Sequence, residues 1–472
     1  MKRILILGAG VAGRMVAEEI FSSDGMGIEL LGFLDDREDL QGEEAGGFPV
    51  HGSCDDLEDK VRELGVDELI IAMPSAGGPE IRRVLRLCRQ SGKPFTILPG
   101  LRQIITGDAR FGQLRPVNPV DLLGRETVDL QEEPVRALVE GRTVLVSGAG
   151  GSIGSEISRQ IAALGPARLI LLGRGENSIF EVEQELRTAW PKLDLLSLIA
   201  DLRDPDSLLR HFREYQPHVV YHAAAHKHVP FMERFPEEAF LNNVLGTRNL
   251  IEAATDSRVD RFVMLSTDKA VDPKGVMGAS KRMAELLVFR ANSTFAASRF
   301  LSVRFGNVLG SRGSVVPLFQ GQIERGGPVT VTDAETTRYF MTIREASMLV
   351  IQASALGDGG EIFILNMGES LNILELARDL IMLHGLEPGR DIPIEITGMR
   401  PGEKLHEQLM SDSEAEASEL GERLMILRPP FDPEQEIEGV LREMEDLARR
   451  GEGRELARRM LDFTSEWGRD SE

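Results

Sequence analysis

The sequence predicts an α/β fold made of two Rossmann-like, doubly wound parallel-sheet domains. Two segments, 1–13 (MKRILILGAGVAG) and 141–154 (GRTVLVSGAGGSIG), join a short apolar run to a glycine-rich turn. After each of them, short apolar runs alternate with amphipathic segments. That alternation is typical of a parallel sheet whose strands are connected by helices packed on its faces.

The predicted strands follow this alternation along the chain. In the first half they are 3–7, 29–34, 68–72 and 95–98, and in the second half 143–147, 168–172, 196–200, 218–222, 261–265 and 301–305. From them we expect four regions: an N-terminal Rossmann-like nucleotide-binding domain (1–100), a linker (101–140), a catalytic domain (141–410) and a charged helical tail (411–472).

Three of these boundaries rest on breaks in the pattern. The linker is irregular and contains Pro116, Pro119 and Pro134. Residues 306–410 depart from strict alternation, which predicts a small C-terminal substrate-binding lobe within the catalytic domain. The tail is charged and periodic (EQEIEGVLREMEDLARR), which predicts a solvated amphipathic helix.

Composition argues against several classes of protein. The chain has 472 residues, of which 42% are hydrophobic and 28% charged, with a formal net charge of −22. Such acidity argues against general nucleic-acid binding, which needs a basic surface. We find no apolar run long enough to span a membrane and no signal peptide. Cys54 and Cys88 predict neither a disulfide framework nor a metal site, so we expect a cytoplasmic protein.

The glycine-rich turns predict sites for a dinucleotide. A glycine turn between a strand and a helix lets the backbone approach a pyrophosphate, whose charge the helix N-terminus favours. In the second turn the expected contacts are Gly148, Gly151, Ser152, Ile153 and Gly154.

The cofactor type depends on residues further on, because an acid about 20 residues after the turn binds a ribose hydroxyl. The first turn has Asp35 and Asp36 at that place, whereas the second has Gly173 and Arg174. This favours NAD for the first turn and NADP for the second, with NAD as the alternative. No catalytic cluster follows the first turn, so a structural or regulatory role for that domain is equally consistent.

Three further positions belong to the predicted cofactor site. Asp201 and Leu202 follow strand 196–200, and Asp201 can accept from the adenine amine or cap the next helix. Ala223, in the run HAAAHKH (222–228), is expected in the wall near the nicotinamide ribose. Although that run has three histidines, no carboxylate or cysteine completes a zinc signature, so no metal is expected.

The most informative stretch is 263–281 (VMLSTDKAVDPKGVMGASK). Its apolar strand ends at Thr267, Asp268 and Lys269, at the sheet edge where open α/β sheets bind ligands. A helix carrying Met277 and Lys281 follows, and residues four apart share a helix face. We therefore expect these five residues to form the catalytic site.

Together with GAGGSIGSEI, HAAAHKHVP, NNVLGT, RFGNVLGSRGSVVPLF, TRYFMTI and RPGEKLHE, this stretch makes the sequence resemble a known family. The chain is similar, from residue 1 to about 410, to the extended short-chain dehydrogenase/reductases. Within them it most resembles the long UDP-N-acetylglucosamine 4,6-dehydratases, often called CapD-like. Long members usually carry transmembrane helices ahead of the first Rossmann unit, so we expect a soluble form or part of a longer protein. The resemblance also implies a homo-oligomer.

One departure from the wider family bears on the chemistry. Most extended reductases have a tyrosine four residues before the lysine, where this chain has Met277, which cannot transfer a proton. The long dehydratases also carry methionine there. Another group must therefore transfer the proton, and Asp268 is the nearest candidate.

The resemblance implies an internal redox cycle on a UDP-sugar. Bound NAD(P) takes hydride from C4, water leaves across C5 and C6, and the hydride returns to C6. In this scheme Thr267 hydrogen-bonds the C4 oxygen, Asp268 accepts the C4 proton and donates at C6, and Lys269 is the C5 base. Lys269 then needs a lowered pKa, through burial or through Lys281, which also holds the nicotinamide ribose. The duties of Asp268 and Lys269 can also be exchanged.

The expected substrate contacts are Arg312 and Arg400 at the diphosphate, Glu403 at the uridine ribose, and Asn243, Asn307 and His226 along the sugar diphosphate. Arginine is favoured because it binds phosphate in bidentate fashion, and Arg338 and Arg344 are weaker candidates. Two alternatives stay open: a nucleotide-sugar epimerase on the same scaffold, and a non-catalytic nucleotide-sensing protein. An epimerase needs no C5 base or C6 acid, which Asp268 and Lys269 supply. Retention or inversion at C5 stays open.

Overall fold

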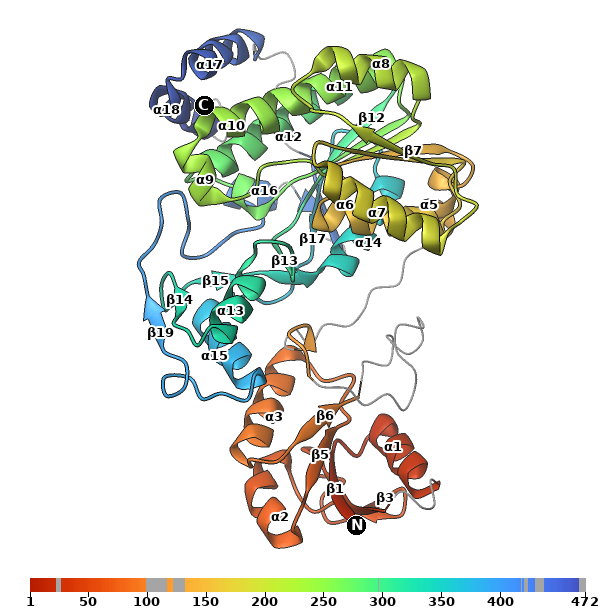
Figure 1. The fold of residues 1–472 in the computed structure, drawn as a ribbon, viewed down its shortest axis with the longest axis vertical. Coiled ribbons are helices and arrows are strands. Elements are labelled where there is room, and N and C mark those ends of the chain that lie inside the picture. Colours follow the sequence, from red (N-terminus) through yellow and green to blue (C-terminus); the bar gives the residue numbers. More distant parts are fainter. Residues whose placement is uncertain are drawn as a thin grey trace. The chain divides into compact units, whose positions relative to one another are not determined.

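The computed structural model describes residues 1–22, 27–98, 117–121, 132–295, 297–416, 418–419, 423–428 and 437–466. They fall into two compact units: Met1–Val128 with Gln322–Pro328 and Ala377–Pro393, and Asp129–Gly321 with Val329–Leu376 and Ile394–Glu472. Both units contain parallel sheets connected by helices, which confirms the predicted fold class (Figure 1). The predicted linker lies largely outside the described residues, although its end forms helix α5 (Glu132–Val139).

The first unit is built on a four-stranded parallel sheet in the order β2-β1-β5-β6. Strands β1 (Lys2–Leu7), β2 (Ile28–Leu34), β5 (Glu68–Ile71) and β6 (Phe95–Ile97) match the predicted strands within one residue. Helices α1 (Val11–Ser22), α2 (Leu57–Leu64) and α3 (Gly78–Gln90) connect them, with a short pair β3 (Glu44–Ala45) and β4 (Phe48–Pro49) between β2 and α2. The 3₁₀ turn η1 (Cys54–Asp56) precedes α2.

The two acids after the first glycine turn bind protein groups. Asp35 accepts hydrogen bonds from the backbone nitrogen of Ala9 at 2.7 Å and from Arg37. Asp36 accepts from the backbone nitrogen of Cys54 at 2.9 Å. Because Ala9 belongs to the glycine turn, Asp35 stabilises the turn itself.

The second unit contains a nine-stranded sheet in the order β20-β21-β17-β12-β11-β10-β7-β8-β9. The parallel strands are β7 (Thr143–Ser147), β8 (Arg168–Gly173), β9 (Leu195–Ile199), β10 (Val219–His222), β11 (Arg261–Leu265), β12 (Arg299–Arg304) and β17 (Ile362–Leu365). The chain runs outward from β7 on one side and resumes at β10 on the other. Ligands bind in open sheets at such a reversal of strand order.

Helices cover both faces of this sheet (Figure 1). On one face lie α8 (Pro205–Tyr215), α9 (Val229–Arg234), α10 (Pro236–Ala239), the π-helical turn η3 (Phe240–Leu245), α11 (Gly246–Asp256) and α12 (Val276–Thr294). On the other lie α5, α6 (Ser152–Ala163), α7 (Glu176–Ala189) and α14 (Ile343–Leu356). The core of the first face continues through α12, whose inner residues are almost all buried.

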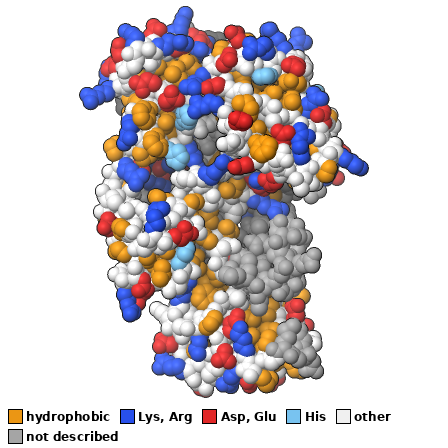
Figure 2. Space-filling view, viewed as in Figure 1, with side chains coloured by type: hydrophobic (Ala, Val, Ile, Leu, Met, Phe, Trp, Pro, Cys, Tyr) orange, Lys and Arg blue, Asp and Glu red, His pale blue; other side chains and the backbone are white. Residues whose placement is uncertain are grey.

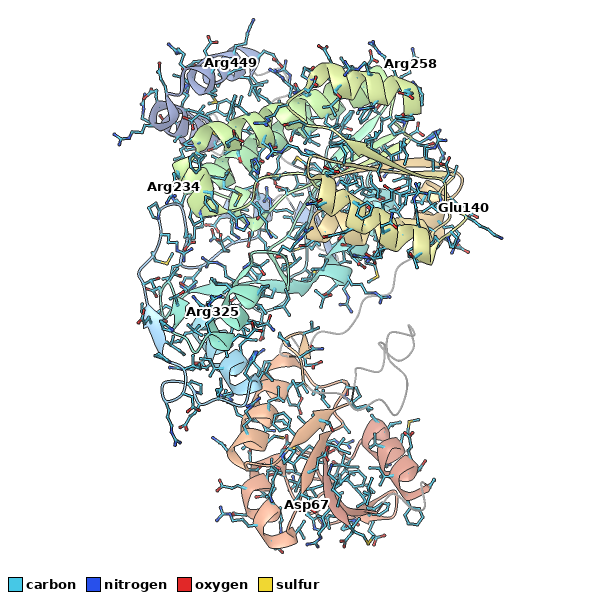
Figure 3. The ribbon with its side chains drawn as sticks, viewed as in Figure 1. Asp67, Glu140, Arg234, Arg258, Arg325 and Arg449 are labelled. Carbon is cyan, nitrogen blue, oxygen red and sulfur yellow. The ribbon has the colours of Figure 1, made fainter. Side chains whose placement is uncertain are left out.

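The prediction that the C-terminal tail is a solvated helix is wrong. Strand β21 (Leu424–Leu427) pairs antiparallel with β17 and with β20 (Ser418–Glu419), after the short helix α16 (Asp412–Glu416). Helices α17 (Glu438–Arg450) and α18 (Gly453–Glu466) bury Leu441, Met444, Met460 and Phe463 in the same core as α12. Only their charged sides are exposed, as at Arg449 (Figure 3). The amphipathic pattern was predicted correctly, but its apolar stripe covers the core.

The predicted substrate-binding lobe, 306–410, is not a continuous segment of its own, because part of this range belongs to the main sheet and its helices. Three two-stranded sheets belong to it: β13 (Asn307–Leu309) with β16 (Phe340–Thr342), β14 (Val329–Val331) with β19 (Ile394–Ile396), and β15 (Thr337–Arg338) with β18 (Leu371–Asn372). Helices α13 (Val315–Glu324) and α15 (Ile373–Leu383) follow in the same range. However, α14 and β17 also fall within 306–410 and belong to the layers of the main sheet.

The surface agrees with the mixed charge of the sequence. On the face shown in Figure 2, Lys and Arg side chains are interspersed with Asp and Glu side chains. Among the described helices, none has the length and apolar character needed to cross a membrane.

Candidate active site

A cavity of about 770 Å³ lies at the carboxyl edge of the nine-stranded sheet, where the strand order reverses. Six segments that are separate in the sequence contribute to its lining: the second glycine turn, the loops after β8, β10 and β11, the start of α12 and the segment after β12. The predicted residues among its lining are Gly151, Ser152, Ile153, Gly154, Arg174, Ala223, His226, Thr267, Lys269, Met277, Lys281, Asn307 and Arg312. The fold thus brings most of the predicted site together.

The glycine turn has the shape that a pyrophosphate requires. Gly148 has a φ of +69°, and a Cβ added there would lie 2.6 Å from the backbone nitrogen of Ala224. A Cβ on Gly154 would lie 2.2 Å from the carbonyl oxygen of Gly148. Gly151 precedes the first turn of α6, and Gly151, Ser152 and Ile153 at this N-terminal end line the cavity. These residues fit a dinucleotide, because small side chains let the phosphates reach the helix N-terminus.

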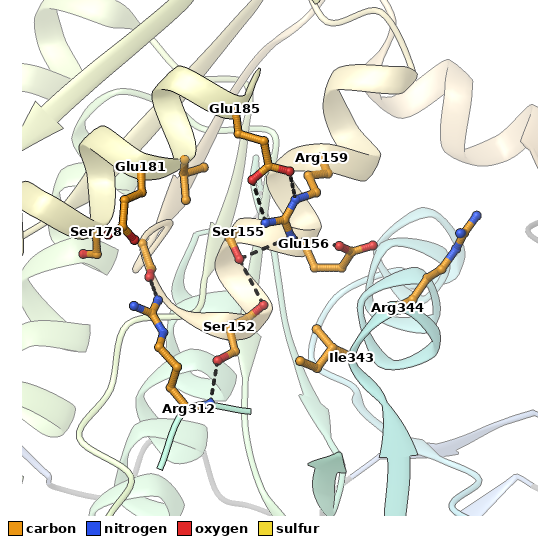
Figure 4. Close-up of a pocket in the computed structure, with 12 residues that line it drawn as sticks. Ser152, Ser155, Glu156, Arg159, Ser178, Glu181, Glu185, Arg312, Ile343 and Arg344 are labelled. Carbon is orange, nitrogen blue, oxygen red and sulfur yellow. Dashed lines mark hydrogen bonds and ion pairs between the residues drawn. The ribbon is translucent and has the colours of Figure 1, made fainter. Parts of the chain in front are cut away.

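Arg312 lies against this turn. Its backbone nitrogen donates to Ser152 Oγ at 3.0 Å, and its guanidinium donates to the carbonyl oxygen of Gly150 (Figure 4). Arg312 also lines a second cavity of about 490 Å³ beside the turn, where Arg344 projects from α14 (Figure 4). Arg312 is therefore close to the expected cofactor phosphates as well as to the main cavity.

The adenine end of the predicted site is built from an acid and two arginines. Asp201 accepts from Arg203 at 2.7 Å, and Arg174 lies 3.7 Å away from the same carboxylate. The pKa of Asp201 is lowered, first by its hydrogen bond with Arg203. The alternative of Asp201 as a helix cap is wrong: Asp204 caps α8, accepting from the backbone nitrogen of Ser207 at 3.0 Å. Leu202 is buried next to Asp201, and neither lines the main cavity.

Thr267, Asp268 and Lys269 form a connected group at the end of β11, in the 3₁₀ turn η4 (Asp268–Ala270). Thr267 Oγ1 donates to Asp268 Oδ1 at 2.9 Å, and Lys269 Nζ donates to the same oxygen at 2.8 Å. Lys269 Nζ also donates to Asn307 Oδ1 at 3.3 Å. The Asp268 side chain is fully buried, whereas that of Lys269 is 22% exposed and lines the cavity.

The sequence-based expectation that the pKa of Lys269 is lowered is wrong. Burial acts to lower its pKa, but the charges of Asp268 and Glu407 outweigh burial and raise the pKa above its ordinary value. Glu407 Oε1 lies 3.7 Å from Lys269 Nζ, and the sequence analysis assigned Glu407 no role. The only signal for it was its place at the end of the RPGEKLHE string.

Lys281 and Met277 line the cavity from the first turns of α12, one helical turn apart, as their spacing predicted. Both are nearly buried. Burial lowers the pKa of Lys281 to about 8, against the opposing charge of Glu285. Lys281, rather than Lys269, is thus the lysine whose charge changes near neutral pH.

Of two predicted substrate residues, His226 lines the cavity and Asn243 does not. Asn243 is buried behind the cavity wall, where its Oδ1 accepts from the backbone nitrogen of His226 at 2.8 Å and its Nδ2 donates to Ser280 Oγ at 3.0 Å. His226 lines the cavity, and its Nε2 lies 3.6 Å from Glu238. Asn243 therefore positions the His226 loop against α12 instead of facing the cavity.

The remaining predicted substrate residues belong to the segment 400–407. Arg400 is exposed and Glu403 is half-buried, and neither lines the main cavity. Arg338, a weaker candidate for the diphosphate, donates to the carbonyl oxygens of Lys404 and Leu405 at 2.7 and 3.0 Å. Its guanidinium therefore braces this segment.

His222, the first histidine of the HAAAHKH run, is fully enclosed at the end of β10. Its Nδ1 lies 2.8 Å from Ser147 Oγ and its Nε2 lies 2.9 Å from Thr247 Oγ1. Both ring nitrogens are thus occupied by protein hydroxyls. Burial, with the charge of Lys281, lowers the pKa of His222 to about 3.

We expect His222 to make the protein less stable as the pH falls. In the unfolded chain a histidine binds a proton below about pH 6.5, whereas folded His222 stays neutral until about pH 3. Between pH 6.5 and 5 this should lower the free energy of unfolding by roughly 2 kcal/mol. Urea unfolding of the wild type and of His222→Asn at several pH values measures this loss. The difference in free energy of unfolding between the two proteins should narrow towards pH 5. The exposed His218→Asn is the control, and parallel curves for wild type and His222→Asn would contradict the prediction.

Comparisons with known proteins agree with this geometry. Residues 144–429 match the family described as "Polysaccharide biosynthesis protein", and residues 1–99 match "CoA-binding domain". The chain is 46% identical to the probable polysaccharide biosynthesis protein EpsC of Bacillus subtilis and 44% identical to the capsular polysaccharide biosynthesis protein CapD of Staphylococcus aureus. Each match covers 90% of this chain and 71% of the relative.

Relatives named for a reaction match about three fifths of the chain. The inverting UDP-N-acetylglucosamine 4,6-dehydratase of Campylobacter jejuni is 33% identical over 59% of this chain and 80% of that protein. The UDP-glucose 4-epimerase of Rickettsia canadensis is 36% identical over 60% of this chain and 82% of that protein. Among solved structures, Pen from Bacillus thuringiensis is 35% identical with a TM-score of 0.58, covering 62% of this chain and 90% of that one.

These matches confirm the CapD-like resemblance. A Rossmann glycine turn meets Thr267 and Lys269 in one cavity, and the family match spans the strands that carry them. The chain belongs to the family of polysaccharide biosynthesis proteins that includes CapD and EpsC and is related to nucleotide-sugar 4,6-dehydratases and epimerases.

Proposed function

We propose that the protein is an NAD(P)-dependent nucleotide-sugar 4,6-dehydratase acting on UDP-N-acetylglucosamine in bacterial glycan biosynthesis. The observation that carries this proposal is the Asp268–Lys269 pair, joined at 2.8 Å, in which Lys269 lines the cavity that the glycine turn also lines. Dehydration requires an acid and a base beside the sugar, whereas a 4-epimerase has no proton to move at C5. The pair therefore favours the dehydratase among the reactions of the relatives.

The cofactor, when bound, supplies a reversible hydride acceptor. We assign the proton transfers and the contacts with the sugar to residues of the chain. Thr267 lies at the cavity wall, where its hydroxyl can hydrogen-bond the C4 oxygen. Asp268 receives the C4 hydroxyl proton and gives it to the departing C6 hydroxyl. Lys269 removes the C5 proton and returns it, while Met277 occupies the place of the usual tyrosine without taking part in proton transfer.

The sugar nucleotide is expected to extend from Lys269 along Asn307 and Arg312, which line the same cavity. Arg312 and Arg400 supply charge for the diphosphate and Glu403 accepts from the uridine ribose. Since Arg400 and Glu403 do not line the cavity, the geometry supports Arg312 more than these two residues. Arg312→Ala should thus raise KM more than it lowers kcat.

For the cofactor we propose NADP, with Arg174 facing the 2′-phosphate. Arg174 lines the cavity and its side chain is 57% exposed, so its guanidinium is accessible. Calorimetric titration with NAD and NADP tests this, because Arg174→Ala should weaken binding of NADP much more than binding of NAD. Equal affinity of the wild type for the two cofactors would contradict the assignment.

Cofactor affinity is expected to fall as the pH rises through about 8. Below that value Lys281 carries the ammonium that holds the nicotinamide ribose, and above it the ammonium loses its proton. Between pH 7 and 9 the Kd for the cofactor should increase by up to about tenfold. Fluorescence titration measures it, and Lys281→Met should bind more weakly with little dependence on pH. A Kd for the wild type that stays constant over this range would contradict the role of Lys281.

Incubation with UDP-N-acetylglucosamine in heavy water tests the proposed reaction. Mass spectrometry should show the loss of one water, and proton NMR should show deuterium at C5, with the ring couplings reporting retention or inversion. A C4 epimer without deuterium would instead establish an epimerase. Unchanged substrate with added cofactor and a folded protein would overturn both assignments.

We further propose that the protein works as a cytoplasmic homo-oligomer and that its first domain, 1–100, binds a nucleotide. Light scattering and titration of the first domain's glycine turn with nucleotides test these two points. A monomer at all concentrations would contradict the first, and unaltered nucleotide binding after Gly10→Asp would contradict the second.

A further inference from the structure

Glu407 is buried beside Lys269 and does not line the main cavity. It is 5% exposed, and its Oε1 lies 3.7 Å from Lys269 Nζ and 3.8 Å from Arg338 Nε. Its Oε2 is buried and has no hydrogen-bond partner among the described residues. An unpaired buried carboxylate oxygen costs stability, so its presence calls for a function.

The lysine beside it poses a chemical problem. To take the C5 proton, Lys269 must be a neutral amine, yet Asp268 and Glu407 flank its ammonium and raise its pKa. Release of the proton to solvent would remove the ammonium that lies between two buried carboxylates, of which Glu407 keeps Arg338 at 3.8 Å, and removing one partner of a buried ion pair is unfavourable. Transfer to one of those carboxylates keeps the total charge of the group unchanged.

Asp268 cannot accept that proton and also serve the C6 hydroxyl. In the proposed reaction it receives the C4 hydroxyl proton and gives it to the leaving water. Glu407, in contrast, has no role at the sugar in that reaction; like Asp268 it does not line the main cavity, and its Oε1 lies 3.7 Å from Lys269 Nζ. It is therefore the carboxylate that can hold a proton through the whole cycle.

We propose that Glu407 takes the proton of Lys269 when the sugar nucleotide binds and so converts the lysine to the base of the reaction. This inference rests on the proposed dehydratase activity. One N–H bond breaks at Nζ and one O–H bond forms on the Glu407 carboxylate, with no change of oxidation state. The lysine amine then takes the C5 proton and returns it, and Glu407 gives its proton back when the product leaves.

The surroundings hold Glu407 in place for this transfer. Arg338 donates to the carbonyl oxygens of Lys404 and Leu405, and Lys404 Nζ donates to the carbonyl oxygen of Val271 at 2.6 Å. These bonds pin the segment that carries Glu407 to β15 and to the loop after β11. The charged groups around Lys269 and Glu407 are thus Asp268, Arg338 and Lys404. The charge of Arg338 disfavours the ammonium form of Lys269, and the carboxylates of Asp268 and Glu407 favour it. For the transfer, Lys269 Nζ has to approach Glu407 Oε1 from the present 3.7 Å.

The test is Glu407→Gln, which keeps the shape of the side chain but cannot accept the proton. We expect kcat to fall by about 10²-fold or more at neutral pH, with little change in KM. Deuterium exchange at C5 should fall in parallel, while oxidation at C4, seen as reduced cofactor, should persist. Activity of the variant should rise steeply with pH, because the lysine must then lose its proton to solvent. Glu395→Gln, an exposed change on β19, is the matched control.

Three results would overturn the inference. Unchanged kcat in Glu407→Gln would show that its carboxylate is not needed. A faster variant with an optimum at lower pH would show that Glu407 only raises the pKa of Lys269. If the glutamine variant does not fold, the Glu407→Asp variant tests the inference instead. Deuterium exchange at C5 in this variant supports proton transfer through the carboxylate. A folded aspartate variant without exchange refutes it. A wild type that forms no dehydrated product would instead refute the proposed function, and this inference with it.

Discussion

Replacing Lys269 with methionine should lower the turnover of UDP-N-acetylglucosamine by about 10²–10⁴-fold, the usual contribution of a positioned acid or base. Methionine has nearly the length of lysine but cannot carry a proton. It would remove the group that donates to Asp268 at 2.8 Å and faces the cavity. Because Lys269 has no place in the cofactor site, the Kd for the cofactor should stay the same.

The measurement combines steady-state turnover with deuterium incorporation at C5. Exchange should disappear together with turnover, since both need the C5 proton to be removed. Lys274→Met is the matched control, because Lys274 is exposed in the loop between η4 and α12 and does not line the cavity. C5 exchange at the wild-type rate in Lys269→Met would show that another residue is the base.

The second large effect is expected at Arg304, the fully buried arginine at the end of β12. Its guanidinium donates to Glu285 at 2.9 Å and to Glu414 at 2.9 Å, and neither side chain has appreciable exposure. Removing one partner of a buried ion pair leaves an uncompensated charge, which costs about 3–5 kcal/mol. Arg304→Met should therefore lower the free energy of unfolding of the second unit by roughly that amount.

Urea unfolding followed by the fluorescence of Trp190, which lies in the second unit, measures this loss. Arg299→Met is the control because Arg299 begins the same strand, with its side chain 52% exposed and 3.4 Å from Asp358. Such a surface pair contributes about 0–1 kcal/mol. Equal midpoints for Arg299→Met and Arg304→Met would contradict the assignment of a stabilising role to the buried group.

The buried group also reaches the active site. Ser266, the residue before Thr267, donates to Glu285 Oε1 at 2.6 Å. Glu285 lies one helical turn after Lys281 on α12 and opposes the lowering of the pKa of Lys281. Loss of Arg304 is therefore expected to disturb both the end of β11 and the helix that carries Lys281.

Local patterns were sufficient to predict ten strands of the two main sheets and the proximity of the residues proposed for the centre of the site, whereas β17, β20 and β21 of the larger sheet were not predicted. Each strand is a short apolar run, so its position can be read without knowing its partners. Thr267, Asp268 and Lys269 are consecutive, and Met277 and Lys281 share a helix face, so their proximity follows from the end of one strand and the start of one helix.

The tertiary structure decided what depends on neighbours that are distant in the chain. Charges from separate segments set the protonation of Lys269, and burial alone was a poor guide because Asp268 and Glu407 outweigh it. The partner of Arg304 in α16 and the burial of α17 and α18 likewise depend on which surfaces meet. By itself, then, the sequence determined the α/β class, the family and the proximity of Thr267, Asp268 and Lys269, because each of these follows from contiguous residues. Only the folded chain brought Glu407 beside Lys269 and took Asn243 out of the cavity, because long-range packing and electrostatics are fixed by three-dimensional contacts.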